Sequence, residues 1–156
     1  MTISENPIHN ILRTAIQREI DAYTLYSTTA QKVDNPQARD MLNDLAAQEV
    51  GHRTKLEGLL DGRVFRVLNR SQQKKVEDLK ITDYLIEVPL DEDSSLQDVL
   101  IVAGKREDAS HNLYASLAQI ADDEQTRKLF EFLANEELGH KRRVETLYEQ
   151  LIYQDN

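Results

Sequence analysis

The chain has 156 residues, the size of one domain with a hydrophobic core of its own. Asp and Glu number 28 against 19 Lys and Arg, and the resulting net charge of −9 argues against nucleic acid or an anionic membrane as the main partner. There is no cysteine, which excludes disulfides, thiol catalysis and Cys-ligated metal sites. The longest apolar run, Val99 to Ala103, is too short to span a bilayer, and the first ten residues lack a secretory signal. We therefore expect a soluble cytoplasmic protein.

Signals for long helices recur along the chain. It contains only five Gly and three Pro, so few residues interrupt helices. Asn6-Pro7 and Asn35-Pro36 are each typical of an N-cap followed by proline at the first helical position. Ser94 or Ser95, and Asp122-Asp123, are further candidate caps. Together these signals predict four helices, over residues 7–32, 36–60, 95–120 and 123–151.

An internal repeat organises these helices. A shift of 88 residues aligns 15–60 with 103–148 without a gap, and 17 of the 46 aligned positions are identical. Each half is typical of a helical hairpin. The segment between them could hold a short surface helix at 71–80, and it is long enough to run back along a helix of roughly 40 Å. The sequence predicts one all-α domain over 1–156, a four-helix bundle of two antiparallel hairpins (7–60 and 95–151) joined by a long crossover (61–94).

Acidic residues occupy positions where bundle packing requires apolar ones. Each predicted helix has an apolar seam with alternating spacings of three and four residues. Four Glu and two His interrupt these seams, and an isolated buried carboxylate is costly unless it finds a partner. The six residues are Glu19, Glu49, His52, Glu107, Glu137 and His140.

Their spacing places them at one level of the bundle. Glu19 lies 15 residues before Asp34 in the turn and Glu49 lies 15 residues after it, so each climb is about 22 Å; the second half repeats this count. Four carboxylates and two neutral imidazoles balance the charge of two divalent cations. Such oxygen and nitrogen donors suit iron or manganese, with zinc as an alternative. This ligand set is that of ferritin-like di-iron proteins. A buried Glu/His network without metal is the other explanation.

At these residues the chain resembles the rubrerythrin-type di-iron carboxylate proteins of the ferritin-like superfamily. The resemblance covers most of the chain apart from the crossover. It is carried by Ala15-Ile-Gln-Arg-Glu19 with Tyr26, Glu49-x-x-His52, Ala103-Gly-Lys-Arg-Glu107 with Tyr114, and Glu136-Glu137-x-x-His140. It implies a ferritin-like bundle that holds two iron ions per chain. Glu19 and Glu107 would be terminal ligands, Glu49 and Glu137 would bridge, and His52 and His140 would each bind one metal.

The resemblance also implies an activity. Family members react with hydrogen peroxide or dioxygen at a diferrous centre, which a reductant must then reset, so an oxidoreductase is the leading expectation. The chain lacks the Cys pairs of the family's rubredoxin module, so the electron donor must be external. A ferritin-like ferroxidase or iron-handling protein is a second hypothesis, and a metal-stabilised interaction module without redox turnover is a third. Because the crossover could pack on a neighbour, we expect a homodimer.

Several residues near the ligands are candidates for supporting roles. Tyr26 and Tyr114 could hydrogen-bond carboxylates of the opposite hairpin, or simply be core tyrosines. Ser110 stands where rubrerythrins proper carry an extra Glu, which puts their ligand switch in doubt. His111 could be an added ligand, a proton donor or a supporting residue. Glu136 could support the site or be solvated. Two mid-helix glycines call for close helix packing or a local bend, namely Gly51 and Gly139.

Overall fold

The computed structural model describes residues 7–61, 90 and 94–152, and this part of the chain is helical without strands. The predicted helices are present within one residue at each end. The predicted crossover and its short helix at 71–80 lie almost wholly outside the described residues. The helices are α1 (Pro7–Lys32), α2 (Pro36–Asp61), α4 (Leu96–Ile120) and α5 (Glu124–Ile152).

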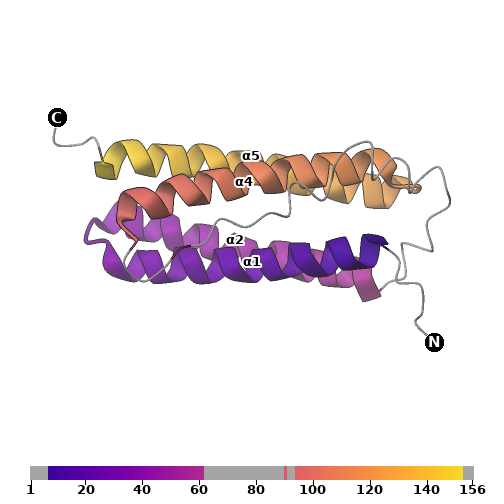
Figure 1. The fold of residues 1–156 in the computed structure, drawn as a ribbon, viewed down its shortest axis with the longest axis horizontal. Coiled ribbons are helices and arrows are strands. Elements are labelled where there is room, and N and C mark those ends of the chain that lie inside the picture. Colours follow the sequence, from indigo (N-terminus) through magenta and orange to yellow (C-terminus); the bar gives the residue numbers. More distant parts are fainter. Residues whose placement is uncertain (1–6, 62–89, 91–93, 153–156) are drawn as a thin grey trace.

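The helices form two antiparallel hairpins that lie against each other along their length (Figure 1). Within each hairpin, α1 with α2 and α4 with α5, the backbones approach closely. The approach between hairpins is sparser, with α2 facing α5 and α1 facing α4. α2 ends and α4 begins at opposite ends of the bundle. This arrangement confirms the predicted four-helix bundle of two hairpins.

Side-chain caps fix where three of the helices begin. In each case an oxygen of the cap residue accepts a hydrogen bond from the backbone N–H three residues later, a group that has no partner within the helix. Ser95 and Asp123 are therefore caps rather than first helical residues, which corrects the predicted starts by one residue. The bonds run from Ala38 N to Asn35 Oδ1 (3.0 Å), from Asp98 N to Ser95 Oγ (3.1 Å) and from Thr126 N to Asp123 Oδ1 (2.7 Å).

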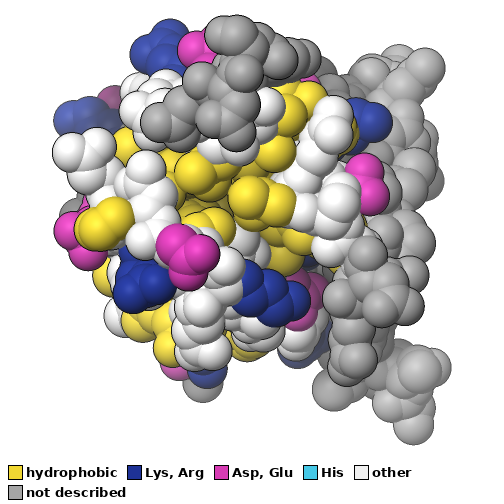
Figure 2. All heavy atoms as spheres, turned by 90° about the vertical axis from the view of Figure 1, so that its left-hand side faces the viewer, with side chains coloured by type: hydrophobic (Ala, Val, Ile, Leu, Met, Phe, Trp, Pro, Cys, Tyr) yellow, Lys and Arg dark blue, Asp and Glu magenta, His cyan; other side chains and the backbone are white. Residues whose placement is uncertain are grey.

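Two hydrophobic clusters fill the bundle, one toward each end. The first includes Leu12, Leu56 and Phe130, and the second includes Leu42 and Leu100. Figure 2 looks onto the end of the bundle at the left of Figure 1, where hydrophobic side chains gather at the centre. No described helix has the length and apolar character needed to cross a membrane. The buried glutamates and histidines lie between the two clusters, near the middle of the helices.

Candidate metal centre

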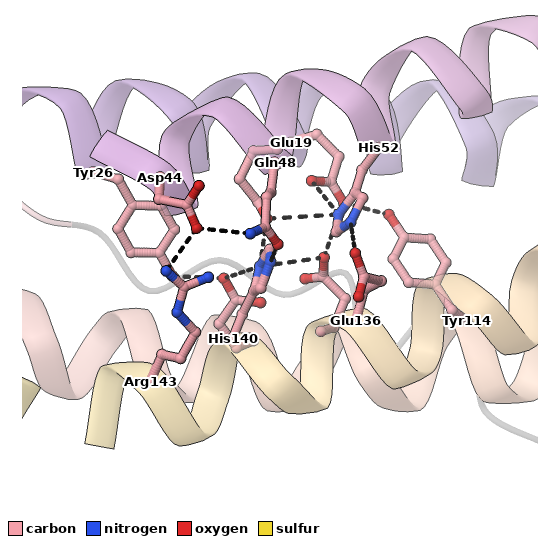
Figure 3. Close-up of polar contacts among 12 residues, drawn as sticks. Glu19, Tyr26, Asp44, Gln48, His52, Tyr114, Glu136, His140 and Arg143 are labelled. Atoms are coloured by element: carbon pink, nitrogen blue, oxygen red, sulfur yellow. Dashed lines mark hydrogen bonds and ion pairs between the residues drawn. The ribbon is translucent and has the colours of Figure 1, made fainter. Parts of the chain in front are cut away.

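The six predicted donors converge in the middle of the bundle (Figure 3). Each of the four helices supplies one glutamate, and α2 and α5 each add a histidine one turn later. All six side chains are buried, with 1–3% of their surface exposed. The shortest contacts cross between the hairpins: Nδ1 of His52 lies 2.7 Å from Oε1 of Glu137, and Nδ1 of His140 lies 2.7 Å from Oε1 of Glu49.

The donors form two equivalent groups. The two imidazole rings are stacked, with centroids 5.2 Å apart. Each Nδ1 also lies near the terminal glutamate of its own hairpin. Nδ1 of His52 is 3.6 Å from Glu19, and Nδ1 of His140 is 3.7 Å from Glu107. One donor atom from each of Glu49, His52, Glu137 and His140 lies within 4.8 Å of the others. Each histidine thus lies beside one terminal glutamate, and Glu49 and Glu137 each contact both histidines.

The buried donor atoms fit metal ions better than they fit one another. In native proteins buried polar atoms nearly always have hydrogen-bond partners, so an unpaired cluster requires an explanation. Carboxylate oxygens and imidazole lone pairs bind divalent cations, and four negative charges equal the positive charge of two such ions. The atoms without a hydrogen bond include Glu19 Oε2, Glu49 Oε1, Glu107 Oε2, Glu137 Oε1 and Nδ1 of both His52 and His140.

A chain of polar contacts orients His140. The carboxylate of Asp44 only accepts hydrogen bonds, so the amide nitrogen of Gln48 donates to it, over 2.8 Å. The amide oxygen of Gln48 therefore faces Nε2 of His140, at 2.7 Å, and accepts a hydrogen bond from its N–H. Arg143 Nη2 donates to the same oxygen of Asp44, at 2.7 Å. With its proton on Nε2, His140 directs the lone pair of Nδ1 into the site.

Two tyrosines hold the terminal glutamates from across the bundle. Tyr26 donates to Oε1 of Glu107 over 2.5 Å, and Tyr114 donates to Oε1 of Glu19 over 2.7 Å. Of the two roles that the sequence left open, the structure therefore shows the hydrogen bond to the opposite hairpin. Burial, together with the charge of the carboxylate that each contacts, raises the pKa of both phenols well above 10. Both hydroxyls thus remain protonated donors.

The glutamates do not share one electrostatic environment. Burial raises the pKa of Glu49 and of Glu137 well above the ordinary value, and the charges of Glu107 and Glu19 raise both further. Burial also acts to raise the pKa of Glu107, but the proximity of Glu137 and His140 and the hydrogen bond from Tyr26 outweigh it and lower that pKa. Burial lowers the pKa of His52, but the contact with Glu19 outweighs it and raises that pKa. The central carboxylates therefore ionise reluctantly without a cation.

The remaining candidates lie around this cluster. Glu136 Oε1 is 3.6 Å from Nε2 of His52, on the outer side of the ring. Ser110 helps to line a cavity of about 20 Å³ that reaches Glu19 and Glu107 between α1 and α4, with room for about one water molecule. His111 lies with Nδ1 2.7 Å from the backbone oxygen of Ala134, so its ring is held against α5 and outside the group of six.

Three residues that orient His140 were not predicted from the sequence, and one of the two explanations offered for the mid-helix glycines fails. Gln48, Asp44 and Arg143 looked like ordinary surface residues; only the position of Gln48, 88 residues before Glu136, could have marked it. Close helix packing does not explain the mid-helix glycines, because a Cβ at either position would meet no atom within 4 Å. Of the two explanations offered for Gly51 and Gly139, close packing is therefore wrong, and a local bend stays a prediction.

Comparison with known families agrees with this geometry. The rubrerythrin family model matches residues 10–148, nearly the whole chain. The chain belongs to the rubrerythrin family. No curated protein and no solved structure matches it. For a rubrerythrin-type, ferritin-like protein, the buried Glu/His cluster is the place of a di-iron carboxylate centre. The individual ligand assignments stay predictions, to which the structure adds that the six residues lie together.

Proposed function

We propose that this rubrerythrin-family chain binds two iron ions between its six buried donors and uses them to reduce hydrogen peroxide or dioxygen. The observation that carries the proposal is the set of buried atoms without hydrogen bonds on six donor side chains at the centre of the bundle, four of which lie within 4.8 Å of one another. When bound, two iron(II) ions supply the two electrons that, with two protons, convert hydrogen peroxide to two water molecules.

The chain's own residues prepare this chemistry. The hydroxyls of Tyr26 and Tyr114 hold the terminal carboxylates in place from the opposite hairpin. Gln48 holds the proton of His140 on Nε2, which keeps Nδ1 free to bind metal. The aliphatic and aromatic side chains above and below the polar layer exclude water from it. The protein thus orients the donor side chains, balances the charge of the metal ions and keeps bulk water away from them.

The cavity between α1 and α4 supports a small oxidant. It is lined by Ala22 and Ser110 and ends at the buried carboxylates, and a volume of about 20 Å³ accepts a molecule of the size of water or slightly larger. Hydrogen peroxide and dioxygen are of this kind, whereas an organic substrate is not. Electrons must then come from an external donor, because these 156 residues contain no cysteine for a second metal centre of the rubredoxin kind.

Rapid mixing of the iron(II)-loaded protein with each oxidant tests the proposal. We expect absorbance of an oxo-bridged diferric product to appear within seconds with at least one oxidant, and an added reductant to restore the diferrous state through repeated cycles. Glu49→Ala should abolish the signal, and Glu57→Ala, which removes a surface carboxylate of the same helix, should leave it unchanged. Accumulation of many irons per chain would instead indicate iron handling, and bound metal inert to both oxidants would indicate a structural role.

A further inference from the structure

The two halves of the metal centre agree in their donors and differ just outside them. The repeat pairs each ligand of one hairpin with an identical ligand of the other. On the outer side of the histidine rings, along α2 and α5, the paired positions carry different residues. The shift of 88 pairs Gln48 with Glu136, Asp44 with Phe132 and Lys55 with Arg143.

A neutral group contacts the outer nitrogen of His140. The amide oxygen of Gln48 lies 2.7 Å from Nε2, and the amide nitrogen of the same side chain donates to the carboxylate of Asp44 over 2.8 Å. Arg143 pairs with this carboxylate at 2.7 Å, so its charge is balanced locally (Figure 3). The Nε2–H of His140 therefore donates a hydrogen bond to the uncharged amide of Gln48. That amide is held in turn by the ion pair of Asp44 with Arg143.

A charged group faces the outer nitrogen of His52. Oε1 of Glu136 lies 3.6 Å from Nε2, and no other ion pair of Glu136 is found among the described residues. Its side chain is 39% exposed. At the position that corresponds to Asp44 stands Phe132, and Lys55 lies over the Phe132 ring, with Nζ 5.7 Å from the centroid. The Glu136 carboxylate therefore faces the ring of His52 directly, whereas an amide stands between Asp44 and His140. Arg143 pairs with Asp44, and no such ion pair of Glu136 with a Lys or Arg is found among the described residues.

We infer that this outer difference makes the two metal positions unequal: the position beside Glu19 and His52 binds a divalent cation first, and the position beside Glu107 and His140 binds second. A carboxylate beside the outer N–H of a metal-bound histidine increases the basicity of the ring and adds negative charge near the cation, whereas an amide does so less. Glu136 and Gln48 act here as positioning residues. The inference rests on metal binding by the proposed centre, and not on its redox reaction.

Titration of the metal-free full-length chain with cobalt(II) tests this order without any oxidant. Cobalt(II) absorbs visible light when bound by oxygen and nitrogen donors, so each step is seen directly. We expect two steps whose affinities differ about tenfold, since outer partners of metal-bound histidines change affinity by roughly 10- to 100-fold. Glu136→Gln gives both histidines an amide partner and should reduce the difference to less than about threefold by weakening the first step.

Two further variants separate this effect from a general loss of charge or structure. Glu131→Gln removes a carboxylate from the same helix, at an exposed site, and should leave both steps unchanged. Gln48→Ala should weaken the second step alone. In proton NMR of the protein with one equivalent of cobalt(II), the exchangeable N–H of the bound histidine gives one strongly shifted signal; Glu136→Gln should move it and Gln48→Ala should not.

The outcomes distinguish this inference from the proposed function. Two cobalt(II) ions that bind with equal affinity, or a Glu136→Gln variant that behaves like Glu131→Gln, would overturn the inference while leaving the metal centre intact. Failure of the chain to bind cobalt(II) and iron(II) at all would overturn both. Two-step binding that Glu136→Gln abolishes would support the inference even if the loaded protein reacted with neither oxidant.

Discussion

At the residue scale, the buried glutamates and histidines are stable only as a group. A single carboxylate in a packed core is strongly disfavoured, and here four lie at one level beside two histidines. Two tyrosine hydroxyls satisfy one oxygen of each terminal glutamate and leave the inward atoms for a metal. Tyrosine hydrogen bonds on the outer oxygens and metal binding on the inner ones would thus explain why charged residues occupy the apolar seam.

The pKa shifts of this group predict an unusual pH dependence for the metal-free protein. The folded-state pKa of Glu49 and of Glu137 lies above 4.5, so each carboxyl stabilises the fold fully below pH 4.5 and loses this contribution as the pH rises through its folded-state value. His52, with a pKa raised from 6.5, acts in the same direction at higher pH. The lowered pKa of Glu107 acts oppositely, but only below about pH 4.5.

We therefore expect the urea midpoint of the chelator-treated protein to fall between about pH 5.5 and about pH 8. The double variant Glu49→Gln, Glu137→Gln removes the two raised carboxyls and should flatten this dependence. A midpoint that rises with pH over this interval in the metal-free wild type would contradict the electrostatic description of the site.

The sequence predicted the six residues that the structure brings together, but not the residues that contact the outer side of the histidine rings. Register explains the difference: Glu19, Glu49, Glu107 and Glu137 interrupt an apolar seam, and such an interruption is visible in a sequence. Gln48, Asp44 and Arg143 lie on faces where polar residues are ordinary, and their contacts join α2 to α5, which no local pattern encodes. The direction of a side chain across a helix interface had to come from the structure.

At the scale of elements, capping signals and the apolar seam predicted the helices almost to the residue. The predicted bounds were off by one residue at some helix ends, because a cap residue has non-helical backbone angles but takes part in the first hydrogen bonds of the helix. Asn35 and Asp123, equivalent in the repeat, both cap the second helix of their hairpin through the same bond to the third helical residue. Close packing was one of two explanations expected for the mid-helix glycines, but the surface around them is open.

The open surroundings of these glycines predict that alanine stabilises both helices. Alanine favours a helix interior over glycine by about 1 kcal/mol, and here the added methyl groups meet no atom. Gly51→Ala and Gly139→Ala should each raise the free energy of unfolding by about this amount in chemical denaturation. Ala47→Gly, at an exposed position of α2, should lower it by a similar amount and serves as the control. A loss of stability in either alanine variant would show that the glycine is needed in the fold.

The cap of α4 gives a second test at this scale. Ser95→Ala removes the acceptor for the N–H of Asp98 and should lower the free energy of unfolding by about 1 kcal/mol. Ser95→Asp keeps an acceptor at the cap and places a negative charge at the helix N-terminus, so it should retain the stability of the wild type. Equal stability of the alanine and aspartate variants would argue against the observed cap.

At the scale of the whole molecule, the polar layer joins the two hairpins between two hydrophobic clusters that also span both of them. The contacts of His52 with Glu137, of His140 with Glu49 and of both tyrosines all run between hairpins. Backbone approach between the hairpins is sparse elsewhere, especially between α1 and α4. The metal ions that this layer fits would therefore link all four helices. The predicted homodimer, the cytoplasmic location and the crossover at 61–94 stay predictions from the sequence.

Metal should accordingly stabilise the entire bundle in one transition. A ligand present at 100 times its dissociation constant adds about 2.7 kcal/mol per site to the free energy of unfolding. Calorimetry should show a single endotherm that moves to higher temperature with iron(II) or cobalt(II) and returns with chelator. In Glu137→Ala the shift should be much smaller. Separate transitions for the two hairpins, with metal affecting only one, would contradict a centre shared between them.

The most direct test of the di-metal centre is to count iron. Metal-free protein is incubated with excess iron(II) without oxygen, unbound iron is removed, and iron is measured per chain. We predict about two irons per chain in the wild type and fewer in Glu49→Ala and Glu137→Ala, because these residues stand between the two positions. A wild-type chain that retains no iron, or either variant that retains two tightly bound ions, would contradict the site described above.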